Sequence, residues 1–222
     1  MCEELNHPQK QSFYTIHHVL GRVAGRLICS LTLTDPSVHG EKYLEDLPRP
    51  YMVVMNHFSS LDPVLIWAYY PDTLSFFIKQ ELHEVPFLAS ISQLAGNIPV
   101  KRDHYDLSAI KSALKHLKEG FNLGIFAEGT RSRDGEVHEL HPSVFSLANK
   151  ARVPLVPVYI HGTLEACPSG SHFPKARPTS IHILQPCLKM TEGGLNKEEL
   201  RVVAEELQES LAEKQRELNE KQ

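Results

Sequence analysis

The chain has 222 residues, of which 41% are hydrophobic and 23% are charged, and its formal net charge is -4. This length and composition predict a single globular domain. The acidic balance excludes a general nucleic-acid-binding protein, because no basic excess exists to neutralise a phosphate backbone, so any anion site is expected to be local.

The cysteines and the N-terminal residues indicate the cellular setting. The four cysteines, Cys2, Cys29, Cys167 and Cys187, are far apart, and none forms a CxxC pair. We therefore expect reduced thiols in the cytosol rather than a disulfide framework or a metal site. The polar start "MCEELNHPQKQ" lacks the pattern of a signal peptide, and no run reaches the roughly 18 to 20 apolar residues of a membrane span, so neither export nor an integral span is expected.

Residues 1–40 are predicted to form an N-terminal helical segment. Between residues 13 and 34 the only full charges are Arg22 and Arg26, one helical turn apart, and the opposite side is apolar. Two interpretations remain open for this amphipathic helix. It can lie in a membrane interface with its arginines toward anionic head groups, or it can dock on the protein's own core. The stretch "TDPSVHGEKYLEDLPRP" then connects it to a body spanning residues 41–222.

This body shows alternating strand and helix patterns. The predicted strands are the short apolar runs "YMVVM", "LSFFI", "NIPV", "LGIF", "LVPVYI" and "SIHILQ". Helical spacing predicts a helix from Tyr105 to Glu119 and a long amphipathic helix after Asn196, with Asn196 as its N-cap and Glu199 three residues further on. The pattern predicts an α/β fold, with a mostly buried mixed sheet flanked by helices.

A polar bend, "NHFSSLDP", directly follows the first of these apolar runs. Pro63 is tolerated in the first turn of a helix, so we expect a helix to begin near Ser59 or Ser60. His57 then lies on the loop and Asp62 in the first turn, which allows the imidazole to fold back onto the carboxylate. Asp62 could fix the tautomer of His57 and leave the other ring nitrogen to take a proton from a hydroxyl group.

The bend has two other interpretations. An aspartate in a first helical turn complements the helix dipole, so the pair could be purely structural. The serines could indicate Ser–His–Asp hydrolysis, but they suit capping roles, and the chain has no G-x-S-x-G motif. A base that activates the hydroxyl of a substrate is the interpretation that we prefer.

A second polar turn, "EGTRSR", follows the apolar run "GIFA" and has the features of an anion site. Gly129 permits close backbone approach, Thr130 offers a hydroxyl and Arg131 offers a planar fork that suits phosphate. The spacing is not that of a nucleotide P-loop. Two more predicted strand ends carry cations, Lys79 on one and Lys101 with Arg102 on the other, and α/β proteins tend to bind ligands at strand ends.

From about residue 40 to about residue 190, the chain resembles the 1-acylglycerol-3-phosphate O-acyltransferase family, also known as lysophosphatidate acyltransferase or PlsC-like. The residues from His57 to Asp62 match the H-x-x-x-x-D motif of that family. The stretches "GNIPVKRD", "FAEGTRS" and "VPLVPVYIHGT" resemble its second, third and fourth blocks, in the same order and with similar spacing.

The resemblance implies transfer of a fatty acyl group from acyl-CoA or acyl-carrier protein to the free hydroxyl of a lysophospholipid, with 1-acylglycerol-3-phosphate giving phosphatidate. It implies that His57 is the base and Asp62 its orienting partner. It places Lys101, Arg102, Glu128, Gly129, Thr130 and Arg131 in the acceptor-phosphate region and Pro157 near the acyl chain. No metal or further cofactor is implied, and the enzyme is expected to act as a peripheral protein on the cytoplasmic side of a membrane.

One departure from the family pattern concerns the acceptor. Where relatives commonly have a lysine-rich "FKKGAF"-like stretch, this chain has "LHPSVF" from Leu140 to Phe145, without a cation. The acceptor could therefore carry a different head group. A His-dependent thioester or lipid hydrolase and a non-catalytic lipid-binding relative are the alternatives from other classes.

Overall fold

The computed structural model describes residues 19, 22–23, 25–27, 29–30, 34–79, 97–100, 107–168, 171 and 174–220. In this part of the chain seven strands form one sheet in the order β1-β7-β6-β2-β5-β3-β4. The strands are β1 (Thr34–His39), β2 (Met52–Met55), β3 (Leu74–Lys79), β4 (Ile98–Val100), β5 (Asn122–Phe126), β6 (Leu155–His161) and β7 (Pro178–Ile183). The helices are η1 (Glu41–Leu44), α2 (Asp62–Tyr69), α4 (Leu107–Lys118), α5 (Pro142–Ala151), α6 (Thr163–Ala166), α7 (Lys189–Glu192) and α8 (Lys197–Asn219).

The sheet is mixed, as predicted. Strands β2 to β6 pair in parallel, whereas β7 runs antiparallel to β6 and carries β1 parallel to itself. Each of the six predicted apolar runs forms a strand. The α/β prediction with a mixed sheet and flanking helices is therefore confirmed.

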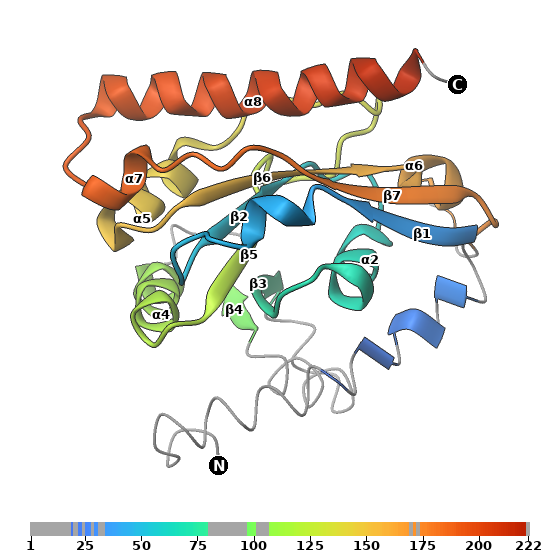
Figure 1. Ribbon diagram of the computed structural model, residues 1–222, viewed down its shortest axis with the longest axis horizontal. Helices are drawn as coiled ribbons and strands as arrows, with labels where there is room; N and C mark the ends of the chain where they lie inside the picture. The colour runs from blue at the N-terminus through green and yellow to red at the C-terminus, as the bar shows by residue number, and fades with distance from the viewer. Residues whose placement is uncertain are drawn as a thin grey trace.

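The central strand β2 explains why the runs are apolar throughout instead of alternating. All four of its residues are 0% exposed, because helices cover both faces of the sheet. Met52 and Val54 pack into a core that includes α4, α5 and α8, while Val53 and Met55 pack into a second core with α2. Figure 1 shows α8 along one side of β6 and β7 and α2 on the other.

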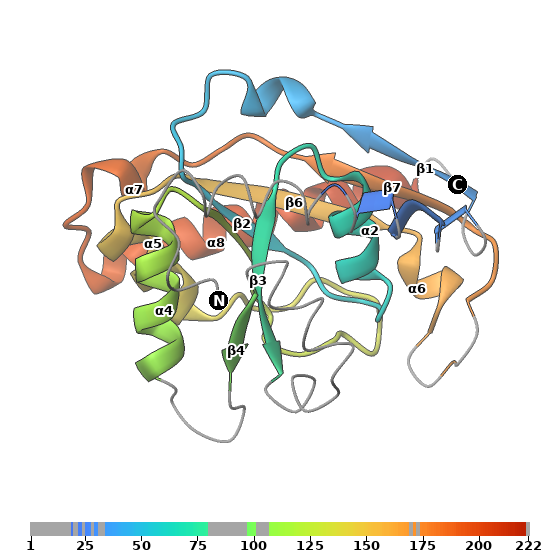
Figure 2. The same cartoon turned by 90° about the horizontal axis from the view of Figure 1, so that it is seen from below.

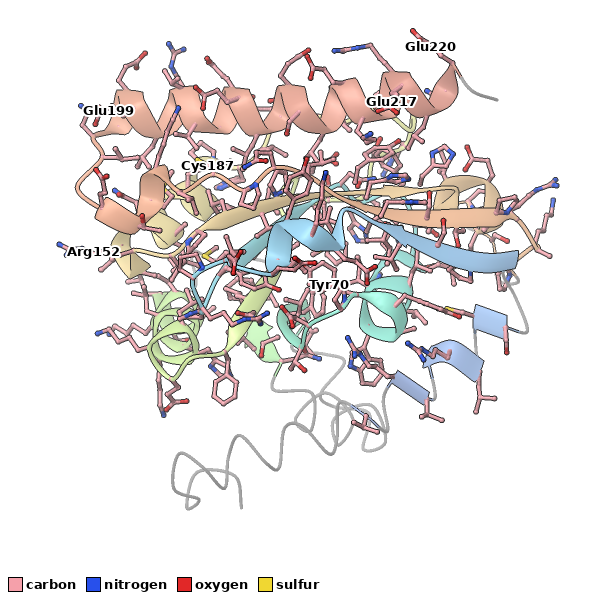
Figure 3. The ribbon with its side chains drawn as sticks, viewed as in Figure 1. Tyr70, Arg152, Cys187, Glu199, Glu217 and Glu220 are labelled. Carbon is pink, nitrogen blue, oxygen red and sulfur yellow. The ribbon has the colours of Figure 1, made fainter. Side chains whose placement is uncertain are left out.

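The two predicted helices of the body are confirmed. Helix α4 lies within the predicted range, and α8 begins directly after Asn196. The Asn196 side chain accepts hydrogen bonds from the N–H groups of Glu198 and Glu199, and the Glu199 carboxylate accepts the Asn196 N–H, which completes a capping box. Glu199 and Glu220 mark the two ends of this helix in Figure 3.

The stretch predicted to be a connection contains a strand instead. Strand β1 lies at the edge of the sheet, outside β7, as Figure 2 shows. Asp35 and Pro36 in "TDPSVH" are residue types typical of turns, so the sequence did not indicate a strand here. An edge strand tolerates proline because it pairs with a neighbouring strand on one side only and needs fewer N–H groups for hydrogen bonds. The sheet therefore begins before the predicted boundary at residue 41.

The arginines of the N-terminal helical segment bind carbonyl groups of the protein itself, although Arg26 is also exposed. Where described, residues between 19 and 30 are helical. Arg22 donates to the carbonyls of Tyr70 and Pro71, and Arg26 donates to the carbonyl of Ala68 at 3.2 Å. The last carbonyls of a helix lack partners within that helix, so these guanidinium groups cap the C-terminal end of α2. The expectation that they point to head groups is wrong.

Three apolar side chains of the same segment are exposed. Val19, Val23 and Leu27 follow one another at intervals of four residues and are 55%, 54% and 60% exposed. We call these three side chains the apolar stripe. None of the helices that the structure describes is both long enough and apolar enough to cross a membrane.

A buried histidine at the sheet edge predicts acid sensitivity of the fold. His182 of β7 stacks on His39 of β1. Burial lowers the pKa of His182 to about 4, and the charges of His39, Lys214 and His161 act in the same direction. The nearby Glu217 carboxylate acts in the opposite direction. The unfolded chain, with an ordinary histidine pKa near 6.5, binds this proton more readily. The contribution of His182 therefore leaves the free energy of unfolding unchanged above about pH 6.5 and lowers it as the pH falls toward 4.

We expect urea denaturation to show a loss on the order of 2 kcal/mol between pH 7 and pH 5, of which the His182→Gln variant removes most. Equal slopes of unfolding free energy against pH in the two proteins would show that another group controls the acid response.

Candidate functional site

The polar bend after β2 is anchored to the neighbouring strand by Asn56. Its side-chain amide donates to the carbonyl of Ile160 at 3.0 Å, and its side-chain oxygen accepts the Ile160 N–H at 2.7 Å. Asn56 is 0% exposed, so these bonds satisfy a buried polar group that would otherwise be costly. The bend therefore leaves the sheet at a defined point beside the end of β6.

His57 and Asp62 meet, as the spacing in the sequence predicted. His57 Nδ1 lies 2.8 Å from Asp62 Oδ2, and the same oxygen accepts the N–H groups of Phe58 and Ser59 at 2.7 and 2.8 Å. Asp62 Oδ2 already accepts two backbone N–H groups, so it acts as an acceptor toward His57 as well, and we assign a proton to Nδ1 of His57. The lone pair on Nε2 is left to accept a proton from a substrate.

Thr163 completes the surroundings of Asp62, and the sequence interpretation did not identify it. Its hydroxyl donates to Asp62 Oδ1 at 2.5 Å, and both side chains are 0% exposed. Thr163 belongs to "HGT" at the end of the fourth block, 101 residues along the chain from Asp62. The hydroxyl fixes the second carboxylate oxygen, so the orientation of the carboxylate is set from both sides.

The helix after the bend begins slightly later than predicted. Helix α2 starts at Asp62, with Leu61 as its N-cap, rather than near Ser59 or Ser60. Ser59 instead has its hydroxyl bonded to the carbonyl of Cys167 at 2.7 Å and accepts the Leu61 N–H at 3.2 Å. The Asp62 carboxylate accepts the N–H groups of Phe58 and Ser59, and these two residues lie before the helix.

The backbone of His57 is held by the second polar turn. The His57 N–H donates to Glu128 Oε1 at 3.2 Å, and the His57 carbonyl accepts the Ser132 N–H at 2.8 Å. The other carboxylate oxygen of Glu128 is buried and has no hydrogen-bond partner in the described part of the chain. Burial raises the pKa of Glu128, while the N–H groups of His57 and His138 act in the opposite direction.

The three residues after Glu128 lie at the surface. Gly129, Thr130 and Arg131 are exposed, and Gly129 adopts a φ of 74°, a conformation that favours glycine. They are on the same turn as the carboxylate that contacts His57. The structure thus places this predicted anion-binding turn beside the predicted base.

A largely apolar pocket of about 610 Å³ has His57 in its wall. Its sides come from β3, β5, α4 and α5, and its apolar lining includes Phe76, Ile78, Ile110, Phe126, Val144 and Leu147. The His57 ring stacks on Phe126 with ring centroids 4.2 Å apart. Such a pocket can hold an alkyl chain with a reactive group near the imidazole.

Polar residues of α5 also line the pocket, and they were not predicted. His141 caps the start of α5 by accepting the Ser143 N–H, and Ser143, Ser146 and Lys150 line the pocket with it. A proline following the cap, as Pro142 does here, is a typical helix-start signal that could have revealed α5. A lysine is thus present on this helix, although none occurs from Leu140 to Phe145.

The remaining predicted site residues are placed differently. Lys101, Arg102 and the side chain of Lys79 lie outside the residues that the structure describes. Pro157 is buried in β6, where it pairs with Val54 of β2, and it is not among the residues that line the pocket. Its position near the acyl chain stays a prediction.

The described side chains include no group of three or more His, Cys, Asp or Glu residues that could hold a metal ion. Cys29, Cys167 and Cys187 are free thiols.

Comparisons with known proteins give consistent results. The model of the Acyltransferase family matches residues 35–161. The chain is 31% identical to a chloroplastic 1-acyl-sn-glycerol-3-phosphate acyltransferase of Brassica napus, over 58% of this chain and 38% of that protein. It is also 31% identical to the Saccharomyces cerevisiae 1-acyl-sn-glycerol-3-phosphate acyltransferase, over 58% of this chain and 44% of the yeast protein.

The matched parts are thus less than half the length of these two curated relatives. Among solved structures, the 1-acyl-sn-glycerophosphate acyltransferase PlsC of Thermotoga maritima matches with a TM-score of 0.77 and 28% identity. That match covers 90% of this chain and 79% of the PlsC chain. The family match includes His57, Asp62 and the turn from Glu128 to Arg131.

Proposed function

The chain belongs to the Acyltransferase family, and from this premise we propose that it transfers a fatty acyl group from a thioester to the free hydroxyl of a lysophospholipid. The acceptor that we propose is 1-acylglycerol-3-phosphate, which gives phosphatidate. The observation that carries the proposal is the His57–Asp62 pair in the wall of an apolar pocket. The named relatives, which are 1-acyl-sn-glycerol-3-phosphate acyltransferases, support the choice of acceptor.

The proposed reaction uses His57 twice. Nε2 takes the proton from the acceptor hydroxyl as the hydroxyl oxygen attacks the carbonyl carbon of the thioester. The tetrahedral intermediate then loses its C–S bond, and the imidazolium returns the proton to the leaving thiolate. Asp62, buried and bonded to Nδ1, stabilises the imidazolium between the two steps. A C–O bond replaces the C–S bond and one proton moves from oxygen to sulfur, so the reaction requires no oxidant or further co-reactant.

The two substrates occupy different parts of the site. The acyl chain lies in the pocket between β3, β5, α4 and α5, where burial of its methylene groups contributes about 0.8 kcal/mol each. The acceptor phosphate contacts the exposed turn that carries Thr130 and Arg131, because a guanidinium fork can bind phosphate through two bonds. Lys79, Lys101 and Arg102 are proposed to contribute to the same anion site. Either acyl-CoA or acyl-carrier protein can serve as the donor.

The test is thiol release from oleoyl-CoA by the purified chain in detergent, with and without 1-acylglycerol-3-phosphate. Release that depends on the acceptor, together with labelled phosphatidate as product, is the expected result. Release without the acceptor, accompanied by free fatty acid, would mean hydrolysis instead. Lysophosphatidylcholine and lysophosphatidylethanolamine, tested in parallel, determine whether the acceptor carries another head group.

We also propose that the protein docks on the cytoplasmic surface of a membrane through the apolar stripe. Val19, Val23 and Leu27 can enter the boundary between head groups and acyl chains, as the apolar face of an interfacial helix does. Arg22 and Arg26 are occupied by carbonyls at the end of α2. Binding should therefore depend on burial of apolar surface more than on anionic lipid.

Replacing Val23 with glutamate is expected to reduce sedimentation with phosphatidylcholine vesicles by about tenfold, because a charge in the interface opposes burial of the stripe. The matched control is Val202→Glu, which makes the same change at an exposed valine of α8, on the other side of the sheet. Equal sedimentation of the two variants would argue against docking through the stripe.

A further inference from the structure

The loop between β5 and α5, residues 127–141, holds the backbone of the proposed base, and we call it the anchoring loop. It supplies Glu128, which accepts the His57 N–H, and Ser132, whose N–H donates to the His57 carbonyl at 2.8 Å. Both backbone hydrogen-bonding groups of His57 are therefore engaged by this loop. Movement of the loop would move the base.

The loop is built around Ser132 by short-range hydrogen bonds. The Ser132 hydroxyl donates to Asp134 Oδ1 at 2.8 Å and accepts the Gly135 N–H at 3.1 Å. Asp134 also accepts the Glu136 N–H at 3.1 Å. These bonds connect the residue that contacts His57 to the segment from Asp134 to Val137.

The side chain of Gln215 connects that segment to the C-terminal helix. Gln215 of α8 donates through Nε2 to the Gly135 carbonyl at 2.5 Å, and its Oε1 accepts the Val137 N–H at 3.3 Å. The side chain is 6% exposed. Because an amide offers a donor and an acceptor in one plane, it can bind two nearby backbone groups at once.

Packing alone does not explain a glutamine at this position. The buried residues of α8 are Val203, Leu207, Leu211 and Gln215, which follow one another at intervals of four along one face. An apolar side chain at 215 would continue that face and would need no hydrogen bonds. The polar side chain is accounted for by its two bonds to the loop.

We propose that Gln215 is a positioning residue for the reaction, which holds the anchoring loop so that Ser132 and Glu128 keep the backbone of His57 in place. This inference rests on the proposed acyl transfer, since it assigns His57 as the base. Gln215 is not among the residues that line the pocket, and its two hydrogen bonds go to Gly135 and Val137, so its effect passes through the loop.

The kinetic test compares Gln215→Leu with Gln208→Leu, which makes the same change at a half-buried position two turns earlier on α8. For Gln215→Leu we expect kcat to fall by about tenfold or more and the KM for the lysophospholipid to rise, because the same loop carries Thr130 and Arg131. The KM for the acyl donor should remain close to that of Gln208→Leu. The melting temperature should fall, because the Gly135 carbonyl and the Val137 N–H lose their partners, so both variants are assayed well below their melting temperatures. Unchanged kcat and acceptor KM overturn the proposal, as does a uniform loss explained by a reduced melting temperature.

A second measurement is independent of catalysis. Amide hydrogen exchange followed by NMR should be about tenfold faster in Gln215→Leu than in Gln208→Leu at Val137, Ser132 and His57, because the bonds form one connected path. Faster exchange at Val137 alone would show that Gln215 does not affect the bonds of Ser132 and His57, and it would overturn the proposal. If the wild-type protein transfers no acyl group, the exchange result still decides whether Gln215 holds the His57 backbone, and only the proposed function fails.

Discussion

Replacing His57 with alanine is expected to lower the rate of acyl transfer by about 10²- to 10⁴-fold, the usual contribution of a positioned general base. The imidazole is fixed at Nδ1 by Asp62 and lies on the ring of Phe126, so its second nitrogen has a defined position in the pocket wall. Alanine removes the proton acceptor and leaves the backbone bonds of the bend intact. The fold should therefore survive the change.

The measurement is acceptor-dependent thiol release, with circular dichroism and the melting temperature as checks of folding. His39→Ala is the control, because His39 is an exposed histidine of the edge strand β1 and does not line the pocket. We expect activity close to wild type for the control. Activity retained by His57→Ala, with the control unchanged, would contradict the role of His57 as the base.

Much of the fold could be predicted because local patterns agree with tertiary packing. The apolar runs at 51–55 and 155–160 are buried on both faces of the sheet, so every residue in them is constrained in the same way. Strand β1 escaped prediction because "TDPSVH" has a turn-like composition, and only its pairing with β7 makes it a strand. The capping box of α8 was predictable because it depends on residues three apart.

The candidate site could be predicted only where its parts are near one another in sequence. His57 and Asp62 are five residues apart, and the geometry of one bend relates them. Asn56, Thr163 and Gln215 act through contacts with residues 104, 101 and about 80 positions away, which no local pattern specifies. The inward orientation of Arg22 likewise depends on where α2 ends, so the helical periodicity alone could not identify its partner.

Replacing Asp62 with asparagine should separate the charge of this side chain from its structural role. The asparagine oxygen can still accept from His57 Nδ1 and from the N–H groups of Phe58 and Ser59. Its NH₂ group would then face Thr163, whose hydroxyl can rotate and accept instead of donating. Because the hydrogen bonds are preserved, only the stabilisation of the imidazolium is lost, and we expect kcat to fall on the order of 10²-fold with little loss of stability.

A second substitution, Thr163→Val, tests the role of the hydrogen bond between Thr163 and residue 62 when it is introduced into the wild type and into Asp62→Asn. Alone it leaves the buried, charged Oδ1 of Asp62 without its hydrogen bond. In the Asp62→Asn background it leaves an uncharged NH₂ group without an acceptor instead, which costs about 1–3 kcal/mol, whereas an unpaired charged group costs more. Urea denaturation of the four proteins should therefore show that the double variant is more stable than the sum of the single changes predicts. Wild-type kcat in Asp62→Asn would mean that Asp62 serves only the start of α2. Additive stabilities would mean that Thr163 bonds the carboxylate and the amide equally well.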